Sequence, residues 1–269
     1  MSDHRYLFAD LNWKDLADLI GYERFLVLLP VGATESHGPH APLSTDALIS
    51  TEVCHRSAMK LHARSCEAYV LPPLSYAVAE TAREFPGTIS ISAELDSAIM
   101  SGICLSLVRQ GIPKICIFNS HFEPSHVKAI YDALEKVYAD SGVRVLFVDV
   151  TRKKYSSRLP DAYRKAETHA DRYETSMIMR IDPSLVNEER RKTLPYVPMN
   201  LADKLFKERL DSFRAFGMAE AYCGDPASAS AAEGEALLEL LSDFVVEDVE
   251  ELFAGDGKAP QRGLYGREG

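Results

Sequence analysis

Two polar stretches of the sequence each place a carboxylate and a histidine two positions apart. The pairs are Glu35 with His37 in VGATESHGPHAPLSTD and His121 with Glu123 in NSHFEPSH, and Asp46 ends the first stretch. On an extended segment, side chains at i and i+2 point to the same side. Carboxylate oxygens mixed with imidazole nitrogens suit Zn²⁺, Mn²⁺ or Fe²⁺ rather than a thiolate site. These five residues are therefore candidate metal ligands.

Five ligands of this kind exceed what one tetrahedral zinc ion with an open position needs. They fit two metal ions that lie roughly 3.5–4 Å apart and share a bridging carboxylate. The competing interpretation is that they are ordinary polar loop residues, because loops are solvated and Ser, Thr and Asp favour helix starts. Spacing alone leaves both interpretations open.

A third polar cluster lies in THADRYETS, after the last predicted strand and a polar loop. It contains His169, Asp171 and Glu174. Outside the spaced pairs, we expect His40, His126 and Asp171 to lie at the surface. His55 and His62 stand at i and i+7 of a predicted helix with no carboxylate nearby, so we expect them to be scaffold residues rather than ligands.

Four short apolar runs alternate with helical patterns along the chain. The runs are FLVLLPV (25–31), YVLPPL (69–74), KICIFN (114–119) and VRVLFVDV (143–150). Their continuous hydrophobicity indicates strands buried on both faces, as in a parallel sheet. The helical patterns cover 44–61, 93–110, a segment from Pro124 to Gly142, and a C-terminal stripe through Leu238, Leu241, Val245, Val249 and Leu252.

This alternation predicts an α/β fold with three layers, α/β/α, and a mainly parallel central sheet. In open parallel sheets, ligands bind beyond the carboxyl ends of the strands. All three polar clusters follow predicted strands, so the fold is expected to bring them to one edge. Residues 182–226 are the least regular stretch, and we expect them to form a lid or an oligomer contact.

Composition argues against several partners. The 269 residues are 46% hydrophobic and 26% charged, with a formal net charge of −10 and no large basic cluster. These values are typical of a globular protein, and they argue against nucleic acid as a partner. No signal-like segment stands at the start and no apolar run approaches the roughly 18 residues of a membrane span. We therefore expect no membrane partner and a cytoplasmic location.

The chain shows no internal repeat and no linker that would divide it. We expect one domain over residues 1–269, with a loosely ordered tail at 254–269. The five cysteines are scattered and never spaced as CxxC. We expect them to be reduced, mostly buried thiols rather than a disulfide framework.

Several ordered motifs resemble the creatininase (creatinine amidohydrolase) family. They are LLPVGATESHGPHAPLSTD, FPGTISI, NSHFEPS, HADRYETS and GDPASASAAEGEALLE, and they extend over most of the chain. The resemblance implies a creatininase-like fold, two divalent metal ions (zinc, with manganese or iron as alternatives) and a homo-oligomer, often a hexamer. It implies a hydrolase that cleaves a carbon–nitrogen bond of a cyclic amide or related small-molecule substrate, with a hydroxide that bridges the ions.

The same resemblance assigns roles to individual residues. The implied metal ligands are Glu35, His37, Asp46, His121 and Glu123, with Asp46 bridging. The His-Phe-Glu order at 121–123 is similar to the His-Tyr-Glu of the creatininase branch, whereas many members lack this glutamate. His169 is the implied proton donor. Glu174 is a supporting catalytic group or, in some members, a metal ligand, so the choice between Glu123 and Glu174 at the second ion stays open.

The chain also departs from the family pattern. The tryptophans that flank creatinine are missing, Lys165 occupies one of those positions, and AVAETARE replaces a glycine-rich loop before FPGT. These departures argue against creatinine as the substrate. Candidate contacts to a more polar or anionic substrate are Arg83, Arg152, Lys153 and Lys165. The alternative functions are an N-formyl deformylase, a keto-inositol ring-opening hydrolase and a metal-holding binding protein without catalysis.

Overall fold

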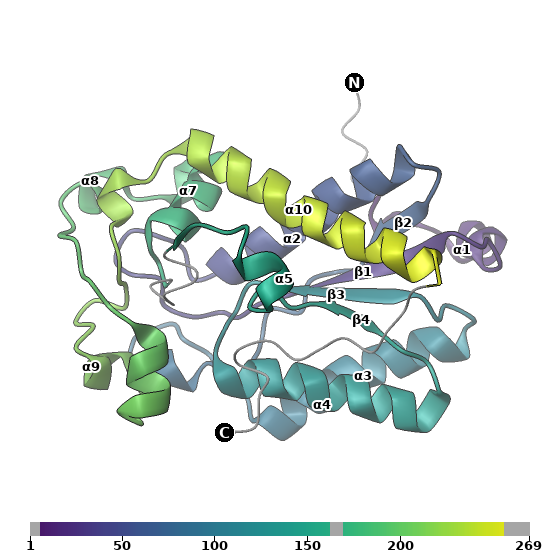
Figure 1. Ribbon diagram of the computed structural model, residues 1–269, viewed down its shortest axis with the longest axis horizontal. Helices are drawn as coiled ribbons and strands as arrows, with labels where there is room; N and C mark the ends of the chain where they lie inside the picture. The colour runs from purple at the N-terminus through teal and green to yellow at the C-terminus, as the bar shows by residue number, and fades with distance from the viewer. Residues whose placement is uncertain (1–5, 162–168, 256–269) are drawn as a thin grey trace.

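A four-stranded sheet lies at the centre of the molecule (Figure 1). The computed structural model describes residues 6–161 and 169–255 of the chain. The strands are β1 (Phe25–Val31), β2 (Glu67–Val70), β3 (Ile115–Asn119) and β4 (Leu146–Val148). Their order is β2-β1-β3-β4, and every pairing is parallel. The predicted parallel sheet is therefore confirmed.

Helices cover both faces of this sheet. On one face lie α2 (Thr45–His62), α7 (Arg172–Ile181) and α10 (Ala231–Phe253), and on the other lie α3 (Ala93–Arg109) and α4 (Pro124–Ser141) (Figure 1). Alternate residues of β1 face the two cores: Leu26 and Leu28 pack with α2 and α10, whereas Val27 and Leu29 pack with α3 and α4. This two-sided burial explains the unbroken apolar run, and it confirms the α/β/α layers.

Shorter elements complete the described parts of the chain. The α-helices are α1 (Trp13–Leu19), α5 (Lys153–Ser156), α8 (Glu188–Arg191) and α9 (Phe213–Phe216). The 3₁₀ turns are η1 (Phe8–Asp10), η2 (Glu80–Ala82), η3 (Pro183–Leu185) and η5 (Pro226–Ser228), and η4 (Asp203–Lys207) is a π-helical turn. Among the described residues, no helix combines the length and the apolar character that crossing a membrane requires.

The predicted elements differ from the observed ones mainly at their ends. The strand expected at 69–74 begins at Glu67 and ends at Val70, because Pro72 and Pro73 have no N–H to donate to a sheet. The helix expected from Pro124 begins there and ends at Gly142, which adopts a left-handed φ of 73°. None of the five cysteines forms a disulfide, and all five are buried, as expected.

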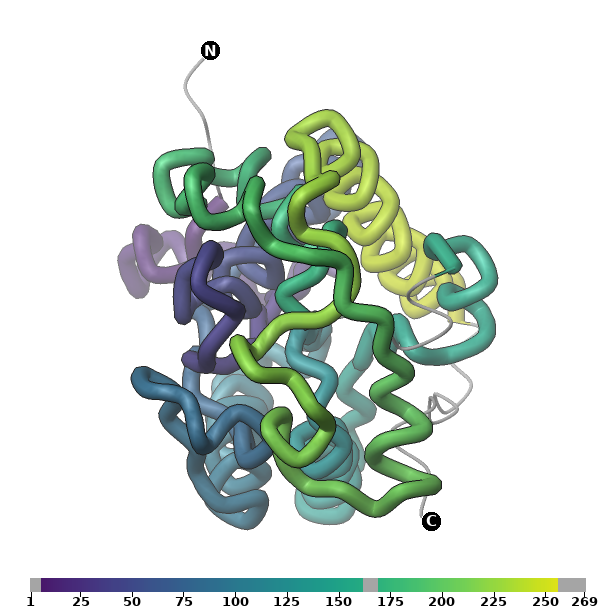
Figure 2. Tube along the Cα trace, turned by 90° about the vertical axis from the view of Figure 1, so that its left-hand side faces the viewer, coloured from purple at the N-terminus to yellow at the C-terminus, as the bar shows by residue number. Residues whose placement is uncertain are grey.

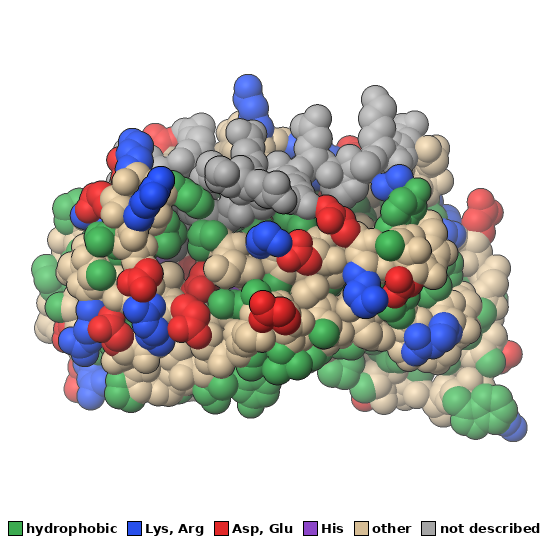
Figure 3. Space-filling view, turned by 90° about the horizontal axis from the view of Figure 1, so that it is seen from below, with side chains coloured by type: hydrophobic (Ala, Val, Ile, Leu, Met, Phe, Trp, Pro, Cys, Tyr) green, Lys and Arg blue, Asp and Glu red, His purple; other side chains and the backbone are tan. Residues whose placement is uncertain are grey.

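The segment 182–226 crosses the side of the molecule to which the loops after β1 and β3 lead (Figure 2). It carries α8 and α9 and covers the carboxyl edge of the sheet. On the face formed by α3 and α4, acidic and basic side chains are interspersed (Figure 3). Lys128–Asp132 and Lys136–Asp140 are ion pairs of this kind on α4.

Candidate metal centre

The loops after β1 and β3 start side by side at the carboxyl edge of the sheet. Val31 pairs with Asn119, so the two polar stretches leave neighbouring strand ends. At Gly32, an added Cβ would lie 2.6 Å from the backbone nitrogen of Ala47. A glycine here therefore lets the loop after β1 pack against the first turn of α2, which carries Asp46.

Asp46 lies between histidines from the two stretches. Its Oδ1 is 3.1 Å from His37 Nε2, and its Oδ2 is 3.1 Å from His121 Nδ1. The same His121 nitrogen is 3.1 Å from Glu35 Oε1, and the same His37 nitrogen is 3.7 Å from Glu174 Oε2. Two groups of possible ligands therefore share Asp46: Glu35–Asp46–His121 and His37–Asp46–Glu174.

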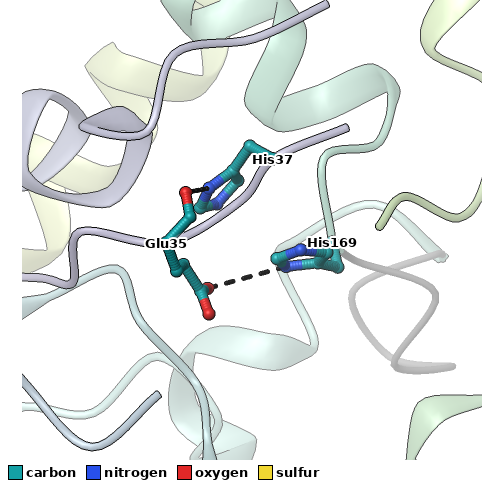
Figure 4. A group of neighbouring side chains, drawn as sticks. All are labelled: Glu35, His37 and His169. Atoms are coloured by element: carbon teal, nitrogen blue, oxygen red, sulfur yellow. Dashed lines mark hydrogen bonds and ion pairs between the residues drawn. The ribbon is translucent and has the colours of Figure 1, made fainter. Parts of the chain in front are cut away.

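His169 lies beside this cluster and forms a third group with Glu35 and His37 (Figure 4). Its Nδ1 is 3.8 Å from Glu35 Oε1, and its Nε2 is 3.0 Å from the carbonyl oxygen of Ser36. A carbonyl oxygen only accepts, so we assign the proton of the neutral ring to Nε2. Nδ1 is then an acceptor that faces the cluster.

The backbone after His169 directs Glu174 toward the cluster. Ala170 adopts a left-handed φ of 49°, a conformation that costs a non-glycine residue about 1–2 kcal/mol. Its N–H donates to Glu174 Oε2 at 2.6 Å. Asp171 caps α7 by accepting from the backbone N–H groups of Tyr173 and Glu174. These contacts fix the first turn of α7, from which Glu174 reaches His37.

The cluster contains buried polar atoms that well-formed hydrogen bonds do not satisfy. Glu35 Oε2 has no partner, and His37 Nε2 and Asp46 Oδ2 meet only the charged neighbours 3.1 Å away, on residues that are at most 2% exposed. A buried polar atom without a partner costs about 1–3 kcal/mol. Divalent cations are the natural partners of such a mixed oxygen and imidazole set. The residues present therefore fit a metal centre.

Electrostatics inside the cluster point to the same interpretation. Burial alone would lower the pKa of His37, but Asp46 raises it to about 10. Burial alone would raise the pKa of Asp46, but His37 and His121 hold it below its usual range. Protonated imidazoles thus supply the positive charge that the carboxylates require. Metal ions would replace these protons, since ligands bind metal in their deprotonated form.

Two other residues at the cluster have pKa values shifted in opposite directions. Burial raises the pKa of Glu174 to about 7. Burial, together with the charge of His37, lowers the pKa of His169 to about 4. Such divergent values are typical of acid and base pairs at catalytic sites. His169 is therefore neutral near pH 7, and its Nδ1 is a hydrogen-bond acceptor.

Glu123 lies apart from the three groups formed by the described residues. Its Oε2 accepts hydrogen bonds from the N–H and Oγ1 of Thr81 at 3.0 and 2.8 Å, and its Oε1 accepts from the N–H of Glu80 at 3.2 Å. Burial raises the pKa of its carboxyl group. Of the five residues implied as ligands, four converge with Glu174, and Glu123 faces η2.

The expectation that His40, His126 and Asp171 lie at the surface is wrong, since they are 2%, 0% and 1% exposed. His126 bonds through Nδ1 to Asp96 and through Nε2 to Asn119, at 2.6 and 3.1 Å. His40 Nε2 is 2.8 Å from Thr175 Oγ1. The two histidines thus bond to residues of other elements, which spacing does not reveal, whereas Asp171 caps its own helix α7. His55 and His62 lie outside the ligand groups, as expected.

A pocket opens onto the cluster, and its space amounts to about 500 Å³ when the part open to solvent is included. Cluster residues and Glu123 line it. Its apolar lining residues are Phe122, Leu201, Leu205, Phe213 and Phe216. Sequence reasoning missed these residues, because four of them lie in the irregular segment 182–226. Arg83, Arg152 and Lys153 do not line the pocket, and Lys165 falls outside the described residues.

Comparison with known families and proteins gives consistent similarities. A family model described as creatinine amidohydrolase (Creatininase) matches residues 9–249. A mycofactocin precursor peptide peptidase of Mycobacterium ulcerans is 29% identical over 81% of this chain and 82% of that protein. A creatinine amidohydrolase of Pseudomonas putida is 29% identical over 68% and 74%. A 3-dehydro-scyllo-inosose hydrolase of Thermotoga maritima is 22% identical over 61% and 52%.

Solved structures of creatininases share the fold. One creatinine amidohydrolase structure superposes with a TM-score of 0.73 at 25% identity, over 92% of this chain and 98% of that chain. A mutant creatininase of Zn-Zn type and a creatininase Mn form give TM-scores of 0.73 and 0.71 at 22% and 24% identity, with the same coverage.

Proposed function

The chain belongs to the creatininase family of hydrolases, and on that premise we propose that it uses two divalent metal ions to cleave the carbon–nitrogen bond of an amide. The observation that carries the proposal is the position of Asp46. Each of its carboxylate oxygens lies 3.1 Å from a histidine of a different strand loop. A carboxylate so placed is able to bridge two ions.

The two groups that share Asp46 define the proposed ligand sets. One ion would be held by Glu35, Asp46 and His121, and the other by His37, Asp46 and Glu174. Glu174 thus takes the place at the second ion that the family resemblance left open between it and Glu123. Zinc and manganese are the preferred candidates, because mixed carboxylate and imidazole ligands suit both.

When bound, the ions would activate a water molecule as nucleophile and polarise the carbonyl oxygen of the substrate. His169 is the proposed proton carrier. Its Nε2–H is held by the Ser36 carbonyl, so its Nδ1 faces the cluster as an acceptor. It takes the proton from the attacking water and returns it to the nitrogen of the breaking bond, which leaves as an amine.

The substrate of this reaction is either a small cyclic amide or an open-chain amide. The similarity to peptide peptidases covers more of the chain than the similarity to creatinine amidohydrolase. This similarity supports adding peptide bonds to the candidate substrates, beside the cyclic amides that the sequence predicted. An N-formyl deformylase and a keto-inositol hydrolase would use the same ligands and differ in the pocket.

Metal content and turnover of Asp46→Ala, measured together, test the proposal. The wild-type protein should bind two ions by elemental analysis and hydrolyse at least one compound among cyclic amides, peptides, N-formyl compounds and keto-inositols. Asp46→Ala should lose both metal and turnover, whereas Asp132→Asn on the exposed face of α4 should retain both. Full activity of Asp46→Ala would contradict the two-metal site. Bound metal with no turnover on any compound would favour the binding protein.

A further inference from the structure

The pocket is lined by residues of two opposite kinds. Four carboxylates line it, and an apolar face is built by Leu201, Leu205, Phe213 and Phe216, which belong to one apolar cluster. Among the described residues that line it, none is Lys or Arg. Beside the apolar residues, a substrate carboxylate would therefore find no cationic side chain among the described lining residues. The pocket favours a substrate that is neutral and apolar beside the reacting bond.

The apolar face is a built feature of the fold. Leu201, Phe213 and Phe216 are 8%, 5% and 4% exposed and belong to a separate apolar cluster with Met218 and Cys223. Ser212 caps the short helix α9 by accepting from Ala215 N–H, and Gly217 ends it with a φ of 91°. Phe213 and Phe216 pack edge to face with centroids 5.9 Å apart. The wall is therefore held in place without a ligand.

Phe213 also fixes which end of a substrate meets this wall. Its ring lies 4.2 Å from the ring of His169, centroid to centroid. His169 is the residue that we propose to protonate the nitrogen of the breaking bond. A group attached to that nitrogen therefore lies next to Phe213, on the apolar side of the pocket.

We propose that the substrate is an amide whose nitrogen carries an aromatic or branched aliphatic group, held by Leu201, Leu205, Phe213 and Phe216. This inference rests on the proposed metal-dependent amide hydrolysis. It replaces the earlier expectation of a polar or anionic substrate, since the basic residues suggested for that role do not line the pocket where they are described. The products are a carboxylic acid and an apolar amine.

The inference can be tested with hydroxamates, without knowledge of the substrate. All of them bind metal through the same two atoms, the carbonyl oxygen and the N–O oxygen. N-methyl-acetohydroxamic acid is the reference. N-benzyl-acetohydroxamic acid places the ring on the nitrogen, and its isomer N-methyl-phenylacetohydroxamic acid places it on the acyl side. N-carboxymethyl-acetohydroxamic acid places an anion on the nitrogen. Affinities for the zinc-loaded protein are measured by calorimetry.

The N-benzyl compound should bind roughly tenfold or more tightly than the N-methyl reference, as expected for an apolar group that fills an apolar pocket. Phe213→Ala and Leu201→Ala should remove this gain and leave binding of the reference intact, which shows that fold and metal are retained. Phe206→Ala is the matched control, because Phe206 is 47% exposed and does not line the pocket.

Two results would overturn the inference while the metal site stands: equal affinity for the N-methyl and N-benzyl compounds, or tighter binding of the acyl-side isomer or the anion. If no hydroxamate binds the zinc-treated protein, the proposed metal-dependent function fails, and the inference fails with it.

Discussion

Thr81 fixes the carboxylate of Glu123, a residue that belongs to none of the three ligand groups formed by the described residues. Its N–H and its hydroxyl both donate to Glu123 Oε2, at 3.0 and 2.8 Å, and Glu80 N–H donates to Oε1 at 3.2 Å. These donors come from AVAETARE, the stretch that replaces the family's glycine-rich loop. The loop that departs from the family pattern therefore orients the carboxylate of Glu123 toward η2.

Exchanging each glutamate for glutamine should separate the roles of Glu123 and Glu174. We expect Glu174→Gln to lose one of two bound ions, because it removes a charged ligand 3.7 Å from His37 Nε2. Glu123→Gln should retain both ions, since its contacts lie on η2. Elemental analysis after dialysis against zinc provides the measurement. The ligand assignment is wrong if Glu123→Gln loses an ion and Glu174→Gln keeps both.

The convergence of the two strand loops was predictable, and the role of each side chain was only partly so. Continuous apolar runs locate the parallel strands, and parallel strands end at one edge, so Glu35, His37 and His121 had to approach each other. The orientation of Glu123 depends on donors about 40 residues earlier in the chain. The apolar face depends on how residues 199–218 fold back over the edge. No local periodicity encodes either contact.

His126 and Asp96 form a buried pair behind the proposed ligand His121. The pair is 2.6 Å apart, and His126 Nε2 is 3.1 Å from Asn119 Oδ1, which also accepts from the backbone N–H of His121. His121 Nε2 in turn lies 2.7 Å from the Val78 carbonyl, and Val78 N–H donates to Asp96. The loop that presents His121 is therefore held on both sides by one network.

Breaking this network should weaken metal binding more than folding. We expect His126→Ala to reduce zinc affinity roughly tenfold or more, as is usual when groups that orient a metal ligand are lost. Competition with a chromogenic chelator measures this affinity. His62→Ala is the control, because His62 lies outside the ligand groups of the described residues. It should change thermal stability without changing zinc affinity. Unaltered zinc affinity in His126→Ala would show that the pair only supports packing.

Gly234 permits the contact between α7 and α10. A Cβ at this position would lie 1.9 Å from the carbonyl oxygen of Ser176. We expect Gly234→Ala to destabilise the protein by about 1–3 kcal/mol, the range typical of overpacking. Gly102→Ala on α3 is the matched control, since nothing lies within 4 Å of its added Cβ. It should stabilise by about 0.5–1 kcal/mol. Denaturant unfolding compares the two, and equal effects would contradict the packing argument.

Glu239 on α10 should make the fold sensitive to acid. Hydrogen bonds from Lys60 and Arg56 on α2 hold the pKa of its carboxyl group below its ordinary value of 4.5. A carboxyl group with a lowered pKa in the folded state stabilises the fold above its unfolded pKa and loses that contribution as pH falls through the folded pKa. The contribution is modest and screened by salt, because the side chain is 46% exposed.

Thermal unfolding between pH 6 and pH 3 measures this contribution. Glu239→Gln should be less stable than the wild-type protein near pH 6, and the difference should shrink as pH falls from the unfolded pKa through the folded pKa of the wild-type carboxyl group. The stability difference between Glu239→Gln and the wild-type protein should also shrink at high ionic strength, since salt screens the ion pairs of Glu239 with Arg56 and Lys60. Glu220→Gln, at an exposed position away from α2 and α10, is the control and should follow the wild-type curve. A stability difference that stays constant across this pH range would exclude the ion pairs as its source.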